Sequence, residues 1–142
     1  MLPPDPHHDL ARQRLTDLRH GLLRLHKILL DSEKLAYEQM YGQIASLGEF
    51  FQLVINDEWF AWLHRLSELV VEIDEMLDAK EEPATAPEAT RMIDRARLLL
   101  KPTEEGAEFG KRYWTAMQRD PDVVLAHAEA KRLLRKNVFP LN

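Results

Sequence analysis

The sequence predicts an all-α protein: an antiparallel helical bundle built on a long two-helix hairpin, with shorter helices packed against it. Apolar residues recur every three or four positions over most of the chain, and no segment has the pattern of a strand. No proline occurs between His7 and Glu82. Since proline costs about 3 kcal/mol inside a helix, this region permits long helices, and the apolar periodicity predicts them.

The first helix should span about residues 9–41. At 1.5 Å per residue, such a helix is about 50 Å long. Gly42 should end it, because glycine readily adopts the left-handed conformation that terminates many helices. Its inward stripe comprises Leu15, Leu18, Leu22, Leu25, Leu29, Ala36 and Met40.

The second helix should begin between Gln43 and Ser46 and end near Ala79. Its apolar surface is broader than that of the first helix, so we expect other helices to cover it on two sides. The main stripe comprises Ile44, Leu47, Phe51, Ile55, Trp62, Leu66, Leu69, Ile73 and Met76. The second apolar face comprises Phe60, Leu63, Val70 and Leu77.

A charged linker over residues 80–85 should separate this hairpin from the third helix. Thr85 and Glu88 have the spacing of a capping box, in which each side chain hydrogen bonds to the backbone of the other residue. The third helix should therefore run over residues 86–100.

Two further segments complete the predicted bundle. Pro102 should stop the third helix, and Thr103 should cap a fourth segment. Asp120 followed by Pro121 is typical of a helix start, which predicts a last helix over residues 121–136.

Length and composition indicate one domain over residues 1–142, with tails at 1–8 and 137–142. Hydrophobic residues make up 45% of the chain and charged residues 30%, which is ordinary globular composition. The absence of cysteine excludes disulfides, thiolate catalysis and cysteine-based metal sites. The net charge of −5 weighs against nucleic-acid binding, because such binding needs a basic surface.

No segment has the pattern of a signal peptide or of a membrane-spanning helix. We therefore expect no membrane association and a cytoplasmic location.

Four polar residues occupy helix positions that should face inward. Two carboxylates brought together at low dielectric need a cation, a proton or an arginine. One interpretation is a metal site for Fe, Mn or Zn, since helical bundles build such sites from inward side chains. The other is a structural network, in which an arginine or tyrosine pairs with a carboxylate and the hydroxyl of Tyr37 or Tyr113 pairs with a histidine. The four candidate ligands are Glu33, Glu58, His26 and His127.

The predicted second helix also carries large rings on two successive faces, more than one neighbouring helix can cover. Core packing accounts for most of them, and a protein interface would account for the excess. The candidate interface residues are Phe50, Trp59, Phe60 and Leu63.

Charge is unevenly distributed along the chain. Residues 57–82 contain nine acidic and two basic residues. Such a stretch is either a solvated helix surface or the source of an electrostatic field that orients a second subunit or partner during binding.

The run from Gly48 to Glu58, GEFFQLVINDE, resembles stretches in uncharacterised bacterial all-helical proteins, as do Trp62-Leu63 and Ser67-Glu68-Leu69. The resemblance covers the first two predicted helices. It implies a helical fold and a bacterial origin, and it implies no activity and no site residue.

These observations favour a non-enzymatic bundle that acts through protein–protein association, most simply as a homodimer, without a cofactor. The shorter helices cannot cover the whole hairpin, and no nucleophile or phosphate-binding motif occurs. The alternative is a metal-binding four-helix bundle with redox or hydrolytic activity at the four candidate ligands.

Overall fold

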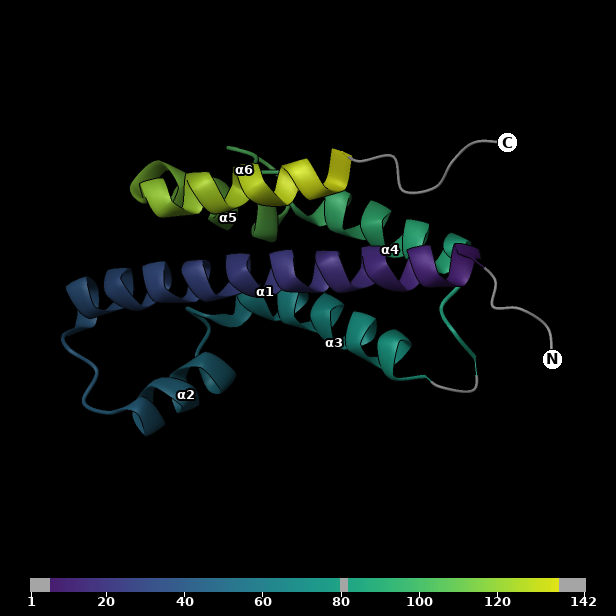
Figure 1. The fold of residues 1–142 in the computed structure, drawn as a ribbon. Coiled ribbons are helices and arrows are strands. Elements are labelled where there is room, and N and C mark those ends of the chain that lie inside the picture. The colour runs from purple at the N-terminus through teal and green to yellow at the C-terminus, as the bar shows by residue number, and fades with distance from the viewer. Residues whose placement is uncertain (1–5, 80–81, 136–142) are drawn as a thin grey trace.

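The structure, a computed structural model, describes residues 6–79 and 82–135. Within these ranges the chain is helical and contains no strand, which confirms the all-α fold class (Figure 1). Among the described helices, none combines the length and the apolar content that a membrane span requires. The elements are α1 (Pro6–Tyr41), α2 (Leu47–Asn56), the 3-10 turn η1 (Ala61–Leu63), α3 (His64–Asp78), α4 (Ala86–Leu99), α5 (Glu108–Arg119) and α6 (Pro121–Arg135).

The long helix α1 is the centre of the bundle and contacts α3, α4 and α6. The colours of Figure 1 show that α3 and α6 run antiparallel to α1, whereas α4 runs parallel to it. Helix α5 lies near the C-terminal half of α1, and α2 lies apart from the other helices (Figure 1). The antiparallel hairpin therefore consists of α1 and α3, and α2 is an appendage at its end.

The prediction of one long second helix is wrong, because the chain turns at Asp57. The backbone of Asp57 is extended, its Oδ1 accepts a hydrogen bond from Trp59 N at 2.8 Å, and its own N–H caps α2. In one straight helix Phe50 and Phe60 would lie about 15 Å apart along the axis. The turn brings their ring centroids within 5.8 Å, and both rings are buried.

Several predicted helix ends are confirmed. Gly42 has a φ of +98° directly after α1, in the left-handed region. Glu88 N donates to Thr85 Oγ1, and Thr85 N donates to Glu88 Oε1, which completes the capping box. The N-terminal boundary differs, since residues 6–8, predicted as tail, form the first turn of α1.

The start of α5 differs from the prediction that Thr103 caps it. Helix α5 begins at Glu108 after the N-cap Ala107, which makes no side-chain capping bond. Thr103 instead donates its N–H to Gly110 O at 3.0 Å, beside the first turn of the helix.

The start of α6 is as predicted, because Asp120 Oδ1 accepts a hydrogen bond from Asp122 N at 2.9 Å. Lys136 and the predicted tail over residues 137–142 lie outside the described residues, as do Lys80 and Glu81 of the linker.

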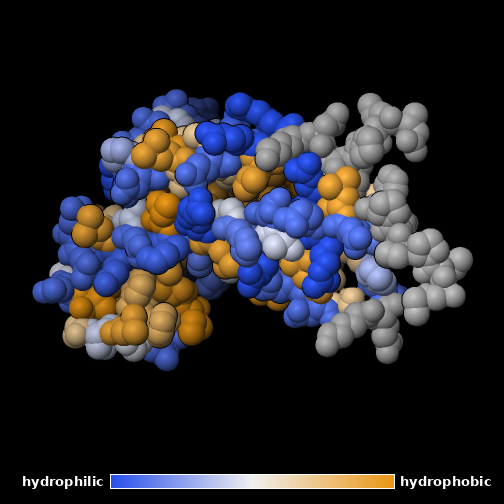
Figure 2. All heavy atoms as spheres, viewed as in Figure 1, coloured by the Kyte–Doolittle hydropathy of each residue, from blue (hydrophilic) through white to orange (hydrophobic). Residues whose placement is uncertain are grey.

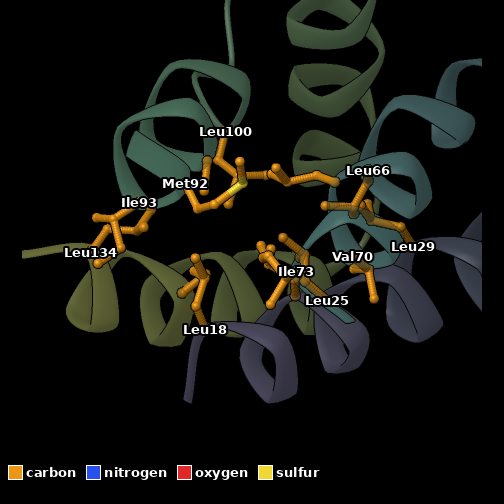
Figure 3. Packing of buried hydrophobic residues seen from close by; sticks show 14 of the residues in the cluster. Leu18, Leu25, Leu29, Leu66, Val70, Ile73, Met92, Ile93, Leu100 and Leu134 are labelled. Atoms are coloured by element: carbon orange, nitrogen blue, oxygen red, sulfur yellow. The ribbon is translucent and has the colours of Figure 1, made fainter. Parts of the chain in front are cut away.

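The core is formed where α1, α3, α4 and α6 meet, and Figure 3 shows side chains from these helices converging there. The α1 stripe is buried as predicted from Leu15 to Leu29, but Met40, near the end of α1, is 66% exposed. Core residues labelled in Figure 3 include Leu18, Leu25, Leu29, Leu66, Val70, Ile73, Met92, Ile93, Leu100 and Leu134.

Candidate functional site

The structure does not bring the four candidate metal ligands together. Glu33 and His127 are buried and His26 is half-buried, whereas Glu58 is exposed in the turn after α2. The inward placement predicted for Glu58 is wrong because it assumed an unbroken second helix. Within the described residues, no group of three or more His, Cys, Asp or Glu side chains could hold a metal ion. The geometry therefore offers no support for a metal-dependent reaction at these residues.

Glu33 pairs with an arginine, as the structural interpretation predicted. Arg119 Nη2 donates to Glu33 Oε1 at 3.0 Å and to Ser32 Oγ at 2.9 Å. The Glu33 side chain is only 4% exposed, whereas that of Arg119 is 32% exposed. A buried carboxylate depends strongly on its charged partner, because desolvation without compensation costs several kcal/mol.

His127 is held by Tyr113, one of the two tyrosines proposed for this role. The Tyr113 hydroxyl lies 2.6 Å from His127 Nδ1 inside the bundle. Burial lowers the pKa of His127, and the nearby charge of Lys131 lowers it further. Burial raises the pKa of Tyr113. Both shifts favour neutral side chains, and the hydroxyl and Nδ1 form one hydrogen bond whose direction follows the tautomer of the imidazole. The pair stabilises the packing of α5 against α6.

His26 lies near a second histidine at the start of α3. Burial lowers the pKa of His26, and the charge of His64 lowers it further. His64 Nε2 lies within hydrogen-bonding distance, 2.9 Å, of Val54 O in the last turn of α2. This contact links α2 to α3. It has no signal in the sequence, because it forms only after the chain turns at Asp57.

A groove lies between α1, α5 and the turn before η1. Its cavity has a volume of about 340 Å³. Trp59 forms part of its wall, and the indole Nε1–H donates to Glu33 O at 3.3 Å. Sequence reasoning missed the two arginines of this groove, Arg112 and Arg119, which share a face of α5 by their seven-residue spacing. The lining residues are Glu33, Ala36, Gln39, Met40, Trp59, Arg112, Thr115 and Arg119.

Three of the predicted interface residues are buried within the chain itself, namely Phe50, Phe60 and Leu63. Trp59 is half-buried, with its ring centroid 5.8 Å from that of Tyr37. The expectation that these side chains form an intermolecular surface is therefore wrong for the three buried residues. The bend at Asp57 lets neighbouring rings of the same chain cover them.

The exposed apolar surface lies on the other side of α2. Leu47, Phe51 and Ile55 are 67%, 52% and 62% exposed, and their four-residue spacing places them in one row. In Figure 2 this region is the orange area at the lower left, over α2. We call this row the α2 outer face. The main stripe of the predicted second helix contained all three residues, but the structure exposes them.

Part of the acidic stretch is neutralised within the chain. Asp74 on α3 pairs with Arg19 on α1, and Glu72 pairs with Arg95 on α4. These acids therefore take part in packing between helices, in addition to contributing surface charge.

No family model, curated protein or solved structure matches this chain. Two features of the fold are candidates for function, the α2 outer face and the groove between α1 and α5.

Proposed function

We propose that this protein acts by protein–protein association through the α2 outer face, most simply with a second copy of itself. The observation that carries the proposal is the row formed by Leu47, Phe51 and Ile55, each more than half exposed. Burying the exposed part of each side chain would contribute about 1 kcal/mol to association. The three are contiguous on one helix, which distinguishes them from scattered exposed apolar residues.

Helix α2 is held to the bundle by its opposite face. Phe50 packs edge-to-face on Phe60, and Lys34 Nζ lies 5.1 Å from the centroid of the Phe50 ring. His64 contacts the carbonyl of Val54. These anchors keep α2 folded in place and direct its outer face away from the bundle, as an exposed docking helix requires.

The low charge of α2 makes a second copy an acceptable partner at this face. Each chain carries a net charge of −5, so most ways of bringing two copies together are opposed by repulsion. Helix α2 carries one charged side chain, Glu49, in ten residues. Two α2 outer faces can therefore meet across a two-fold axis with little repulsion, burying the same row on each copy.

Sedimentation velocity between about 1 and 200 µM tests this proposal, because such a small interface should have a dissociation constant in the micromolar range. The unmodified protein should shift from the monomer mass to the dimer mass as concentration rises. Phe51→Asp should stay monomeric, because it places a charge in the centre of the row.

The matched control is Leu98→Asp, which introduces the same charge at a residue on α4 that is 68% exposed. This variant should dimerise like the unmodified protein. A monomer at every concentration would refute self-association. Equal loss of dimer in both variants would show that the interface is not the α2 outer face.

A further inference from the structure

The groove between α1 and α5 is built from two facing rows of side chains. Glu33, Ala36 and Met40 line it from α1 with spacings of three and four residues, and Arg112, Thr115 and Arg119 line it from α5 with the same spacings. Residues with these spacings lie on one face of a helix, so each helix presents a continuous row. The cavity of about 340 Å³ is within the range of small-molecule sites.

The polar groups in this groove are incompletely paired within the described part of the chain. Arg119 neutralises Glu33. Glu33 Oε2 has no hydrogen-bond partner among the described residues, but it is buried and therefore does not face a ligand in the groove. Arg112 is half-buried and forms no hydrogen bond or ion pair with a described residue. The lining therefore has one net positive charge, which belongs to the guanidinium of Arg112.

We propose that this groove binds a small organic carboxylate with a flat apolar body. The guanidinium of Arg112 matches a carboxylate through two parallel hydrogen bonds, the strongest geometry for this pair. Trp59 and Met40 supply apolar surface for the body of the ligand. One net positive charge matches a monoanion. The site uses α5 and the end of α1, so it is separate from the α2 outer face and does not depend on self-association.

The proposal is tested by titrating isotope-labelled protein with benzoate and following the indole N–H resonance of Trp59 by NMR. Trp59→Phe identifies this resonance among the three tryptophans. Benzoate should shift it with a dissociation constant of about 1 mM, since a ligand of this size has few atoms to contribute binding energy. Benzyl alcohol has a similar ring and no charge, and it should bind at least about tenfold more weakly.

Arg112→Gln should weaken benzoate binding about tenfold, because it removes the bidentate partner. The matched control is Lys111→Gln, which removes one positive charge from an exposed neighbouring position and should change binding by less than about twofold. Well-dispersed spectra will show that both variants are folded.

Three results would overturn the proposal. The first is no benzoate-induced shift of the Trp59 resonance up to about 10 mM. The second is benzyl alcohol binding as tightly as benzoate. The third is an equal loss of binding in Arg112→Gln and Lys111→Gln, which would indicate general charge attraction to the surface.

Discussion

The Tyr113 hydroxyl lies 2.6 Å from His127 Nδ1, and the two rings meet at an interplanar angle of 70° between α5 and α6. Tyr113 is fully buried and His127 nearly so. A polar pair in this environment stabilises the fold only while both members are satisfied, because each would lose its hydration without compensation. The position that the sequence marked as a candidate ligand therefore has a structural partner.

Removing the Tyr113 hydroxyl should destabilise the protein. Tyr113→Phe keeps the ring but leaves His127 Nδ1 buried without its hydrogen-bond partner, at an expected cost of about 1–2 kcal/mol in the free energy of unfolding. Urea unfolding monitored by circular dichroism measures this cost. In a His127→Leu background the same change should cost less, because the unpaired nitrogen is gone. Equal costs in both backgrounds would contradict a pairwise interaction.

Acidification should destabilise the fold through His127. Its pKa in the folded protein lies below the ordinary value of 6.5, because of burial and the charge of Lys131. Between these two pKa values the unfolded chain binds more protons than the folded chain, so the free energy of unfolding rises with pH. This stability is fully present above about pH 6.5 and is lost as pH falls through the folded pKa.

Urea unfolding between about pH 5 and pH 8 measures this dependence. His127→Gln should reduce the slope of the free energy of unfolding against pH. The substitution should not abolish this slope, since burial and His64 also lower the pKa of His26. A slope that is unchanged in His127→Gln would assign the pH dependence to other groups.

The pair between Glu33 and Arg119 should respond asymmetrically to substitution. Arg119→Met leaves a carboxylate that is 4% exposed without its cation, which should cost about 3 kcal/mol. Glu33→Gln leaves a guanidinium that is 32% exposed and already bonded to Ser32, so it should cost about 1 kcal/mol.

The control for this comparison is Arg24→Met, which breaks an exposed pair with Glu129 and should cost less than about 0.5 kcal/mol. Denaturant midpoints of the three variants measured under one set of conditions provide the test. A similar cost for all three would mean that burial of Glu33 does not govern the strength of its pair.

Two glycine-to-alanine substitutions should have opposite effects. A Cβ at Gly110 would lie 2.7 Å from Lys101 O and 2.8 Å from Thr103 Oγ1, so Gly110→Ala should cost about 1–3 kcal/mol. A Cβ at Gly48, in α2, would lie 3.9 Å from its nearest neighbour, Ser46 Oγ. Gly48→Ala should therefore raise the free energy of unfolding by about 0.5–1 kcal/mol. Thermal unfolding of both variants tests this difference. If Gly110→Ala stabilised the protein, residues 101–103 would have room to move away from α5 and accommodate the added methyl group.

The sequence determined the features that depend on neighbouring residues. The stripe from Leu15 to Leu29 indicated which side of α1 faces the core, since a helical period is a local property. Thr85 with Glu88 and Asp120 with Pro121 marked two helix starts, because capping bonds form within three residues.

The tertiary structure decided where the second helix breaks and which polar groups meet. Residues 43–79 have a pattern compatible with one helix. The turn at Asp57 combines a local hydrogen bond to Trp59 N with the burial of Phe60 against Phe50 and Tyr37, and that burial exists only in the folded chain. The pairing of Glu33 with Arg119 spans 86 positions of the chain, and periodicity indicates that a side chain faces inward without identifying what it will meet. Local patterns set the free energy of forming a helix, whereas the choice between continuing and turning depends on burial supplied by distant residues.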